Sequence, residues 1–137
     1  MYLTNKAQHA VTIMLDIMLH SKNYSVPVRI VDITNRHSIP ISYVSGVLVH
    51  LVQAGLVRGK RGPHGGYKLN KSPKQITIMD IVYAAQSPIK LKDCGKMDCL
   101  HSACMANYLW MGMIFQAETY LSKITLADVL SEKNMSL

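Results

Sequence analysis

Apolar residues near the start of the chain recur at three- and four-residue steps, the spacing of a helix that buries one face. The pattern follows Thr4, a good N-terminal capping residue, and consists of Ala7, Ala10, Val11, Met14, Leu15 and Met18. A short helix is predicted at 28–35. Pro40 suits the first turn of a further helix, which runs through "ISYVSGVLVHLVQA" and ends at Gly55. Two short helices joined by a tight turn are typical of a helix-turn-helix.

The pattern changes at "LVRGKRGPHGGYKLN", where apolar or basic runs flank a tip rich in glycine and proline. Such a tip cannot be helical and favours a turn between two strands. We predict a β-hairpin with its tip at 63–66. A helix-turn-helix followed by a basic hairpin is a winged helix.

The second half of the chain predicts two short helices around one long helix. Thr77 with Asp80, and Thr125 with Asp128, have the spacing of a capping box in which Asp replaces the more usual Glu. Between them, "MANYLWMGMIFQAETYLSKI" contains no turn residue except Gly112. The expected fold class is therefore mainly α with a small β-hairpin wing.

The predicted long helix is apolar on two sides. One stripe contains Ala106, Trp110, Met113, Ala117, Leu121 and Ile124, and the other contains Tyr108, Met111, Phe115 and Thr119. A single small domain cannot easily cover both stripes. We expect the surplus face to pack against a second subunit in a two-fold homodimer. The alternative is a central helix buried within one chain.

The positive charge lies in the first half of the chain. Residues 1–76 hold ten Lys/Arg and two Asp/Glu, a net charge of +8, whereas residues 77–137 hold five and six, a net charge of −1. This asymmetry favours a nucleic-acid or anionic-membrane partner for the first half, with a merely basic, solvated surface as the alternative. The first apolar run is short and interrupted by Asp16, so neither a signal peptide nor a membrane span is expected.

The predicted winged helix supplies candidate DNA contacts. Arg61, in the predicted wing, is the leading candidate for a minor-groove or phosphate contact. Lys60, Arg58 and Lys68 would add phosphate affinity, and the wing glycines Gly65 and Gly66 permit close approach. On the second helix, the exposed polar candidates are Ser42, Tyr43 and Ser45. Capping is the alternative role for Ser42, and a partly buried core contact for Tyr43.

Three cysteines, Cys94, Cys99 and Cys104, are spaced with four residues between neighbours. Three thiols cannot all pair within one chain, and reduced thiols in the cytoplasm are expected. Thiolates are soft ligands that suit iron-sulfur clusters, zinc or copper(I), and the spacing permits zinc without favouring it. Their polar, charged neighbours argue against three buried, inert cysteines.

A fourth ligand is not evident from the spacing alone. Asn107 lies three residues after Cys104 and on the same side of the long helix, but a neutral amide is a poor ligand for iron or zinc. His101 within the loop is chemically better. Gln8 and His9, on the first helix, are candidates that could come from the partner subunit.

From "YLTNKAQHAVTIMLDI" through "RGPHGGYKL" to "CLHSACMANYLW" and "ITLADVL", nearly the whole chain resembles the IscR-type (Rrf-two) bacterial transcription regulators. The resemblance implies a homodimer whose long helices cross, and a three-cysteine loop that holds a [2Fe-2S] or [4Fe-4S] cluster. Cluster status would then alter which promoters are bound. The implied domains are a winged helix-turn-helix at 1–86, a cluster loop at 87–104 and a dimerisation region at 105–137.

Carried over by position, Cys94, Cys99 and Cys104 match the cluster cysteines, and Arg61 matches the wing arginine that contacts DNA. Asn107 stands where the iron-sulfur assembly regulators have a histidine ligand. This departure favours relatives that use three cysteines and another ligand, including members that respond to nitric oxide or iron. In some of them the first helix supplies the ligand, at positions corresponding to Gln8 or nearby.

The sequence suggests three classes of function. The leading hypothesis is a cytoplasmic regulator, such as a repressor, that binds a roughly two-fold symmetric DNA operator under the control of an iron-sulfur cluster. The second is a regulator of the same fold that uses the cysteines as a zinc site or thiol redox switch. An enzyme is disfavoured, because the chain lacks a C-x-x-C pair, a nucleotide-binding glycine fingerprint and paired carboxylates.

Overall fold

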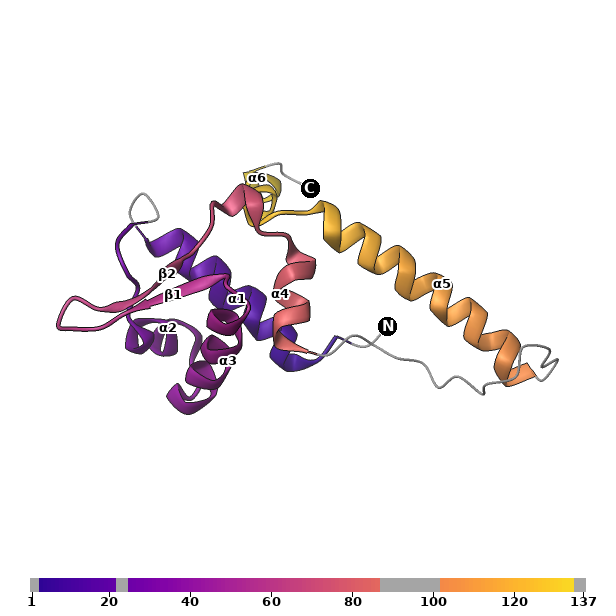
Figure 1. Ribbon diagram of the computed structural model, residues 1–137, viewed down its shortest axis with the longest axis horizontal. Coiled ribbons are helices and arrows are strands. Elements are labelled where there is room, and N and C mark those ends of the chain that lie inside the picture. The colour runs from indigo at the N-terminus through magenta and orange to yellow at the C-terminus, as the bar shows by residue number, and fades with distance from the viewer. Residues whose placement is uncertain (1–2, 22–24, 87–101, 135–137) are drawn as a thin grey trace.

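The computed structural model describes residues 3–21, 25–86 and 102–134. Within these ranges the chain is mainly helical and carries one antiparallel hairpin (Figure 1). The elements in chain order are α1 (Asn5–His20), α2 (Ile30–His37), α3 (Ile41–Gln53), β1 (Val57–Lys60), β2 (Gly66–Leu69), the 3-10 helix η2 (Pro73–Gln75), α4 (Ile78–Ala85), α5 (Ser102–Lys123) and α6 (Leu126–Asn134). The predicted fold class, with its helix-turn-helix and β-hairpin wing, is confirmed.

The predicted capping residues begin the helices as expected. The Thr4 hydroxyl accepts a hydrogen bond from the backbone N–H of Ala7, 3.1 Å away, at the start of α1. At α4, Thr77 and Asp80 form a reciprocal capping box with distances of 3.0 and 3.1 Å. Thr125 and Asp128 do the same for α6. Each pair satisfies two backbone N–H groups that have no partner inside the helix.

Four boundaries differ from the sequence prediction. Helix α2 begins at Ile30 rather than at residue 28, because Val28 instead pairs with the wing strand β2. Pro40 is the N-cap of α3 rather than part of its first turn. Gly66 belongs to β2 rather than to the hairpin tip. Helix α5 begins at Ser102, so it includes Cys104, which was expected in the loop.

The core surrounds α1, which packs against α3, α4 and β2. Ile13, Met14 and Ile17 are fully buried on its inner face. They pack in the same core cluster as Val44 and Leu48 of α3. Each side chain of this size contributes roughly 1.5–3 kcal/mol when it is buried. This core fixes the orientation of α3 relative to the rest of the winged helix.

Helix α5 projects away from the winged helix, with only its C-terminal end near α6 and the core (Figure 1). At that end, Leu126 is fully buried, and its N–H donates to the Ile76 carbonyl over 3.0 Å. The Ile78 N–H donates to the Ile124 carbonyl over 2.9 Å. Most of the remaining apolar surface of α5 is therefore uncovered within the described chain. No helix in the three described ranges is long and apolar enough to cross a membrane.

Candidate nucleic-acid interface

Helix α3 has one face in the core and the opposite face in solvent. Val44, Val47, Leu48 and Leu51 are buried. The outer face carries Ser42, Ser45, Gly46, Val49, His50, Val52 and Gln53, of which Ser45 and His50 are half-buried and the others are exposed. The predicted contacts Ser42 and Ser45 therefore lie on the accessible face.

Tyr43 is half-buried and turned toward α1 rather than fully into solvent. Its hydroxyl lies 3.1 Å from Nδ1 of His9, and the two rings meet edge to face with centroids 5.3 Å apart. A candidate metal ligand, His9, is thus in contact with a candidate DNA-binding residue. The contact joins the first helix directly to α3.

The wing places its cations on an exposed hairpin. The strands are anchored by the buried pair Val57 and Leu69, and the remaining pairs in register are Arg58 with Lys68, Gly59 with Tyr67, and Lys60 with Gly66. Arg58, Lys60 and Arg61 are all exposed. Arg58 and Lys68 carry like charges opposite one another and repel. An anion that binds between or beside them would reduce this repulsion.

Backbone contacts hold the wing against the segment that precedes α2. Val28 and Tyr67 exchange two N–H to carbonyl hydrogen bonds, each 2.8 Å long. Gly66 adopts a φ of +150°, and a Cβ added there would lie 2.5 Å from the Val28 carbonyl oxygen. Only glycine fits this approach. A Cβ at Gly65 would likewise collide with the Lys60 carbonyl oxygen.

A groove of about 690 Å³ lies between α2, α3 and the wing. Its apolar lining includes Val31, Val49 and Val52, which are 41–52% exposed. Arg29, Lys60 and Arg61 add positive charge, and none of the described residues that line the groove is acidic. The surface formed by α3, the wing and this groove suits a polyanion that also carries apolar groups, which describes a DNA strand.

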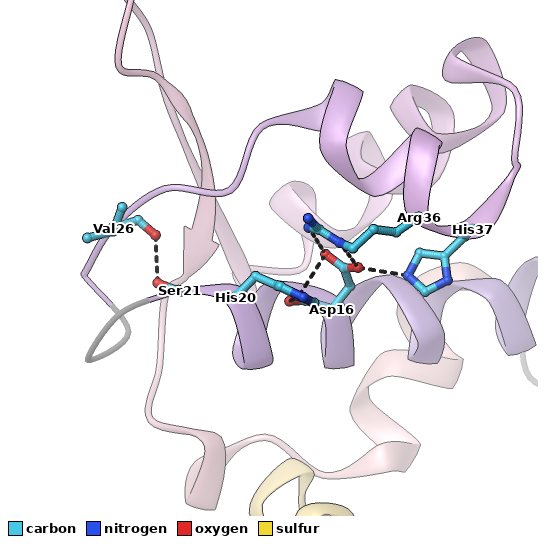
Figure 2. A network of polar contacts seen from close by, with 6 residues as sticks. All are labelled: Asp16, His20, Ser21, Val26, Arg36 and His37. Atoms are coloured by element: carbon cyan, nitrogen blue, oxygen red, sulfur yellow. Dashed lines mark hydrogen bonds and ion pairs between the residues drawn. The ribbon is translucent and has the colours of Figure 1, made fainter.

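A buried carboxylate on α1 holds the end of α2, next to this surface (Figure 2). Asp16 of α1 has a side chain only 2% exposed, and it accepts hydrogen bonds from Arg36 Nε and Nη2 over 2.8 and 2.6 Å. His37 Nε2 donates to the same carboxylate over 2.8 Å. His20 Nδ1 lies 3.6 Å from Asp16 Oδ1. Three basic residues thus converge on one carboxylate.

Burial alone would raise the pKa of Asp16. Hydrogen bonds from Arg36 and His37, and the positive charges of Arg36 and His20, outweigh burial and hold this pKa below its ordinary value of 3.8. The same contact raises the pKa of Arg36. An ionised Asp16 therefore ties the C-terminal turn of α2 to α1, just before the turn into α3.

Sequence reasoning missed this network. In the sequence alone, Asp16 is only an interruption of an apolar run. A signal was present, because Asp16 lies between Ile13 and Ile17 on the buried face of an amphipathic helix. A charge in such a position requires a partner, but the partner comes from α2 and cannot be identified from local spacing.

The candidate cluster ligands are only partly described by the structure. Cys94, Cys99 and His101 lie outside the described residues. Cys104 lies in the first turn of α5, and Asn107 follows one turn later and is half-buried. Gln8 is exposed on α1, and its Nε2 donates to the Leu3 carbonyl over 3.2 Å. Among the described residues alone, no group of three or more His, Cys, Asp or Glu side chains could hold a metal ion.

Comparison with known proteins places this architecture in a family. The family model Rrf2, described as an iron-dependent transcriptional regulator, matches residues 3–132. The transcriptional regulator IscR of Photobacterium profundum is 35% identical, over 98% of this chain and 78% of that protein. A putative HTH-type transcriptional regulator of Haemophilus influenzae is also 35% identical, over 98% of this chain and 90% of that protein.

Solved structures agree with this assignment. IscR from T. potens superposes with a TM-score of 0.78 and 26% identity, covering 97% of this chain and 88% of that one. CymR, the global cysteine regulator of B. subtilis, gives a TM-score of 0.79 and 25% identity, covering 96% and 98%. These relatives are transcription regulators rather than enzymes. The chain belongs to the Rrf2 family of DNA-binding, winged-helix transcription regulators.

Proposed function

We propose that this protein is a homodimeric, cytoplasmic regulator whose operator binding is controlled by an iron-sulfur cluster held by Cys94, Cys99 and Cys104. The observation that carries the proposal is the combination of a cation-lined α3–wing surface with three thiols placed at and before the start of a projecting, apolar helix. One half of the chain binds DNA and the other half senses.

The wing and α3 supply the DNA contacts in this proposal. Arg61, Lys60 and Arg58, which are all exposed, neutralise phosphates in this proposal, and Arg61 at the tip enters a minor groove. Ser42 and Ser45 on α3 approach base edges or phosphates. Gly65 keeps the tip narrow, because a side chain there collides with the Lys60 carbonyl oxygen, and Gly66 lets the wing lie against Val28. Tyr43 contributes through its hydroxyl, which His9 orients.

The donor set fits a thiolate-held cluster. Three cysteines provide soft, anionic ligands, and α5 carries the last of them in its first turn. When bound, the cluster would supply a redox- and ligand-sensitive iron centre. The description of the family as iron-dependent and the similarity to IscR proteins support iron over zinc.

The fourth ligand remains among the candidates named from sequence. His9 already contacts Tyr43 through Nδ1, which leaves only Nε2 for a metal. Gln8 and Asn107 offer amide oxygens, and His101 offers an imidazole. A weakly held fourth site suits a sensor, because the exposed iron is open to oxygen, nitric oxide or small thiols.

A second copy of the chain is the partner proposed for α5. Its uncovered surface includes Tyr108, Leu109, Met111 and Phe115, which are 58–74% exposed. A continuous apolar face of this kind is typical of an obligate interface. Two-fold pairing through α5 would place the two wings side by side. Such a dimer would bind an operator with two-fold symmetry.

The structural similarity to CymR favours one alternative. CymR is named a global cysteine regulator, so a protein of this fold can regulate transcription in response to a signal other than an iron-sulfur cluster. In this alternative, the cysteines of the chain form a thiol redox switch or a zinc site. Both candidates share the DNA-binding half and differ only in what the cysteines hold.

Anaerobic reconstitution separates the two. We expect protein incubated with iron and sulfide to develop cluster absorption and a cluster Mössbauer spectrum, and each Cys→Ala variant to lose both. Stoichiometric zinc with no charge-transfer band would refute the cluster. His101→Ala and His9→Ala identify a histidine ligand if either one alters the spectrum or the stability of the cluster.

A further inference from the structure

The outer face of α3 lacks the side chains with which proteins usually read bases. Between Ile41 and Val52 the helix contains no Arg, Lys, Asn, Gln, Asp or Glu. These are the residues that form paired or specific hydrogen bonds to guanine, adenine and cytosine in the major groove. Gln53 is available only as the last residue of the helix. Before Gln53, the polar side chains left on the outer face are Ser42, Ser45 and the half-buried His50, so α3 offers few groups for base-specific hydrogen bonds.

Gly46 is not explained by the packing of the protein itself. It lies in the middle of α3, is exposed, and a Cβ added there would meet nothing within 4 Å. Glycine in a helix interior lowers stability relative to alanine. A missing side chain at this position has a use if another surface must approach the helix closely.

Val49 lies three residues after Gly46 on the same outer face and is 52% exposed. A single exposed valine needs no explanation. Val49, however, lines the groove together with Val52, which is 41% exposed, and with the cations Arg29, Lys60 and Arg61. An apolar floor beside positive charge matches a DNA strand, whose phosphates are anionic and whose thymines carry methyl groups.

We propose that Val49 reads the C5-methyl groups of thymines in the operator, and that Gly46 lets α3 lie close enough to the base edges for this contact. The inference rests on the proposed DNA-binding function and adds the chemistry of its specificity. Recognition by α3 then depends on apolar contact with thymine, and the cations around the groove hold the adjacent phosphates.

The test uses an operator selected by the full chain from random duplexes. Each thymine of a half-site is replaced singly by uracil, which lacks only the methyl group, and affinity is measured by fluorescence anisotropy. We expect at least one replacement to weaken binding about fourfold, the value of one buried methyl-sized group. Val49→Ala should bind the thymine and uracil duplexes equally. Val26→Ala, a control at a 47% exposed valine outside the groove, should keep the discrimination.

Gly46→Ala tests the close approach. Since the added methyl group has free space within the protein, this variant should melt at a temperature at or above that of the wild type, yet bind the operator at least fivefold more weakly. Wild-type affinity in Gly46→Ala would overturn the close approach, and equal affinity of the wild type for every uracil duplex would overturn methyl reading. Failure to enrich any sequence overturns the DNA-binding proposal itself, and this inference with it.

Discussion

Arg36 holds Asp16 through two parallel hydrogen bonds, from Nε to Oδ2 over 2.8 Å and from Nη2 to Oδ1 over 2.6 Å. This fork-to-fork geometry is the strongest form of a carboxylate contact. Arg36 and His37 lie in the last turn of α2, and Asp16 lies in α1. The contact therefore fixes the position of α2, the first helix of the helix-turn-helix, against α1 (Figure 2).

Asp16→Asn should destabilise the fold by about 2 kcal/mol. Removing one partner of a fully buried ion pair costs roughly 3–5 kcal/mol. The Arg36 side chain is 34% exposed, so its solvation offsets part of this loss. Urea denaturation measures the change. Asp32→Asn on α2 is the matched control and should cost less than about 1 kcal/mol. Equal losses in the two variants would show that Asp16 has no special role.

The same carboxylate predicts how stability depends on pH. The folded pKa of Asp16 lies below its ordinary value of 3.8, so the stabilisation is fully present above the unfolded pKa and is lost as pH falls through the folded pKa. Wild-type stability should therefore drop below about pH 4. In Asp16→Asn the drop should be shallower, as measured by thermal melts between pH 6 and pH 3. Parallel curves would contradict this linkage.

Arg61→Ala should weaken operator binding roughly tenfold. It should also reduce the slope of log affinity against log salt by about 1 for each subunit, because one phosphate-neutralising contact is lost. Binding isotherms at several salt concentrations measure both quantities. Lys74→Ala, an exposed cation in η2 outside the groove, is the control and should leave them unchanged. An unchanged isotherm for Arg61→Ala would refute the wing contact.

Leu109→Glu should separate the proposed dimer. Leu109 is 66% exposed on α5, and a buried, unpaired carboxylate at the interface should raise the dimer dissociation constant by about a hundredfold. Sedimentation equilibrium measures the constant. Leu109→Gln removes the same apolar side chain without adding a charge, and should raise the dissociation constant less than Leu109→Glu does. A monomeric wild-type protein would instead contradict the proposed pairing.

The elements that were predicted well depend on local chemistry. Thr4 and Thr77 start helices because their hydroxyls accept nearby N–H groups, and Gly65 lies in a turn where a side chain would collide with the Lys60 carbonyl oxygen. These signals lie within a few residues of the structure they determine. The basic wing and the accessible face of α3 followed from the same local pattern.

What was missed depends on contacts between distant segments. Asp16 pairs with residues 20 and 21 positions away, and Val28 leaves α2 because it pairs with Tyr67. Helix periodicity gives no information on either contact. The early start of α5 at Ser102 likewise changes the position of Cys104 from loop to helix without any turn residue to mark it.

The most direct test of the account is the affinity of one selected operator for cluster-loaded and cluster-free protein, measured anaerobically on the same preparation. We predict that the two forms differ at least tenfold in affinity, and that the difference disappears in Cys94→Ala. Identical isotherms for protein with and without a spectroscopically verified cluster would contradict cluster control of DNA binding.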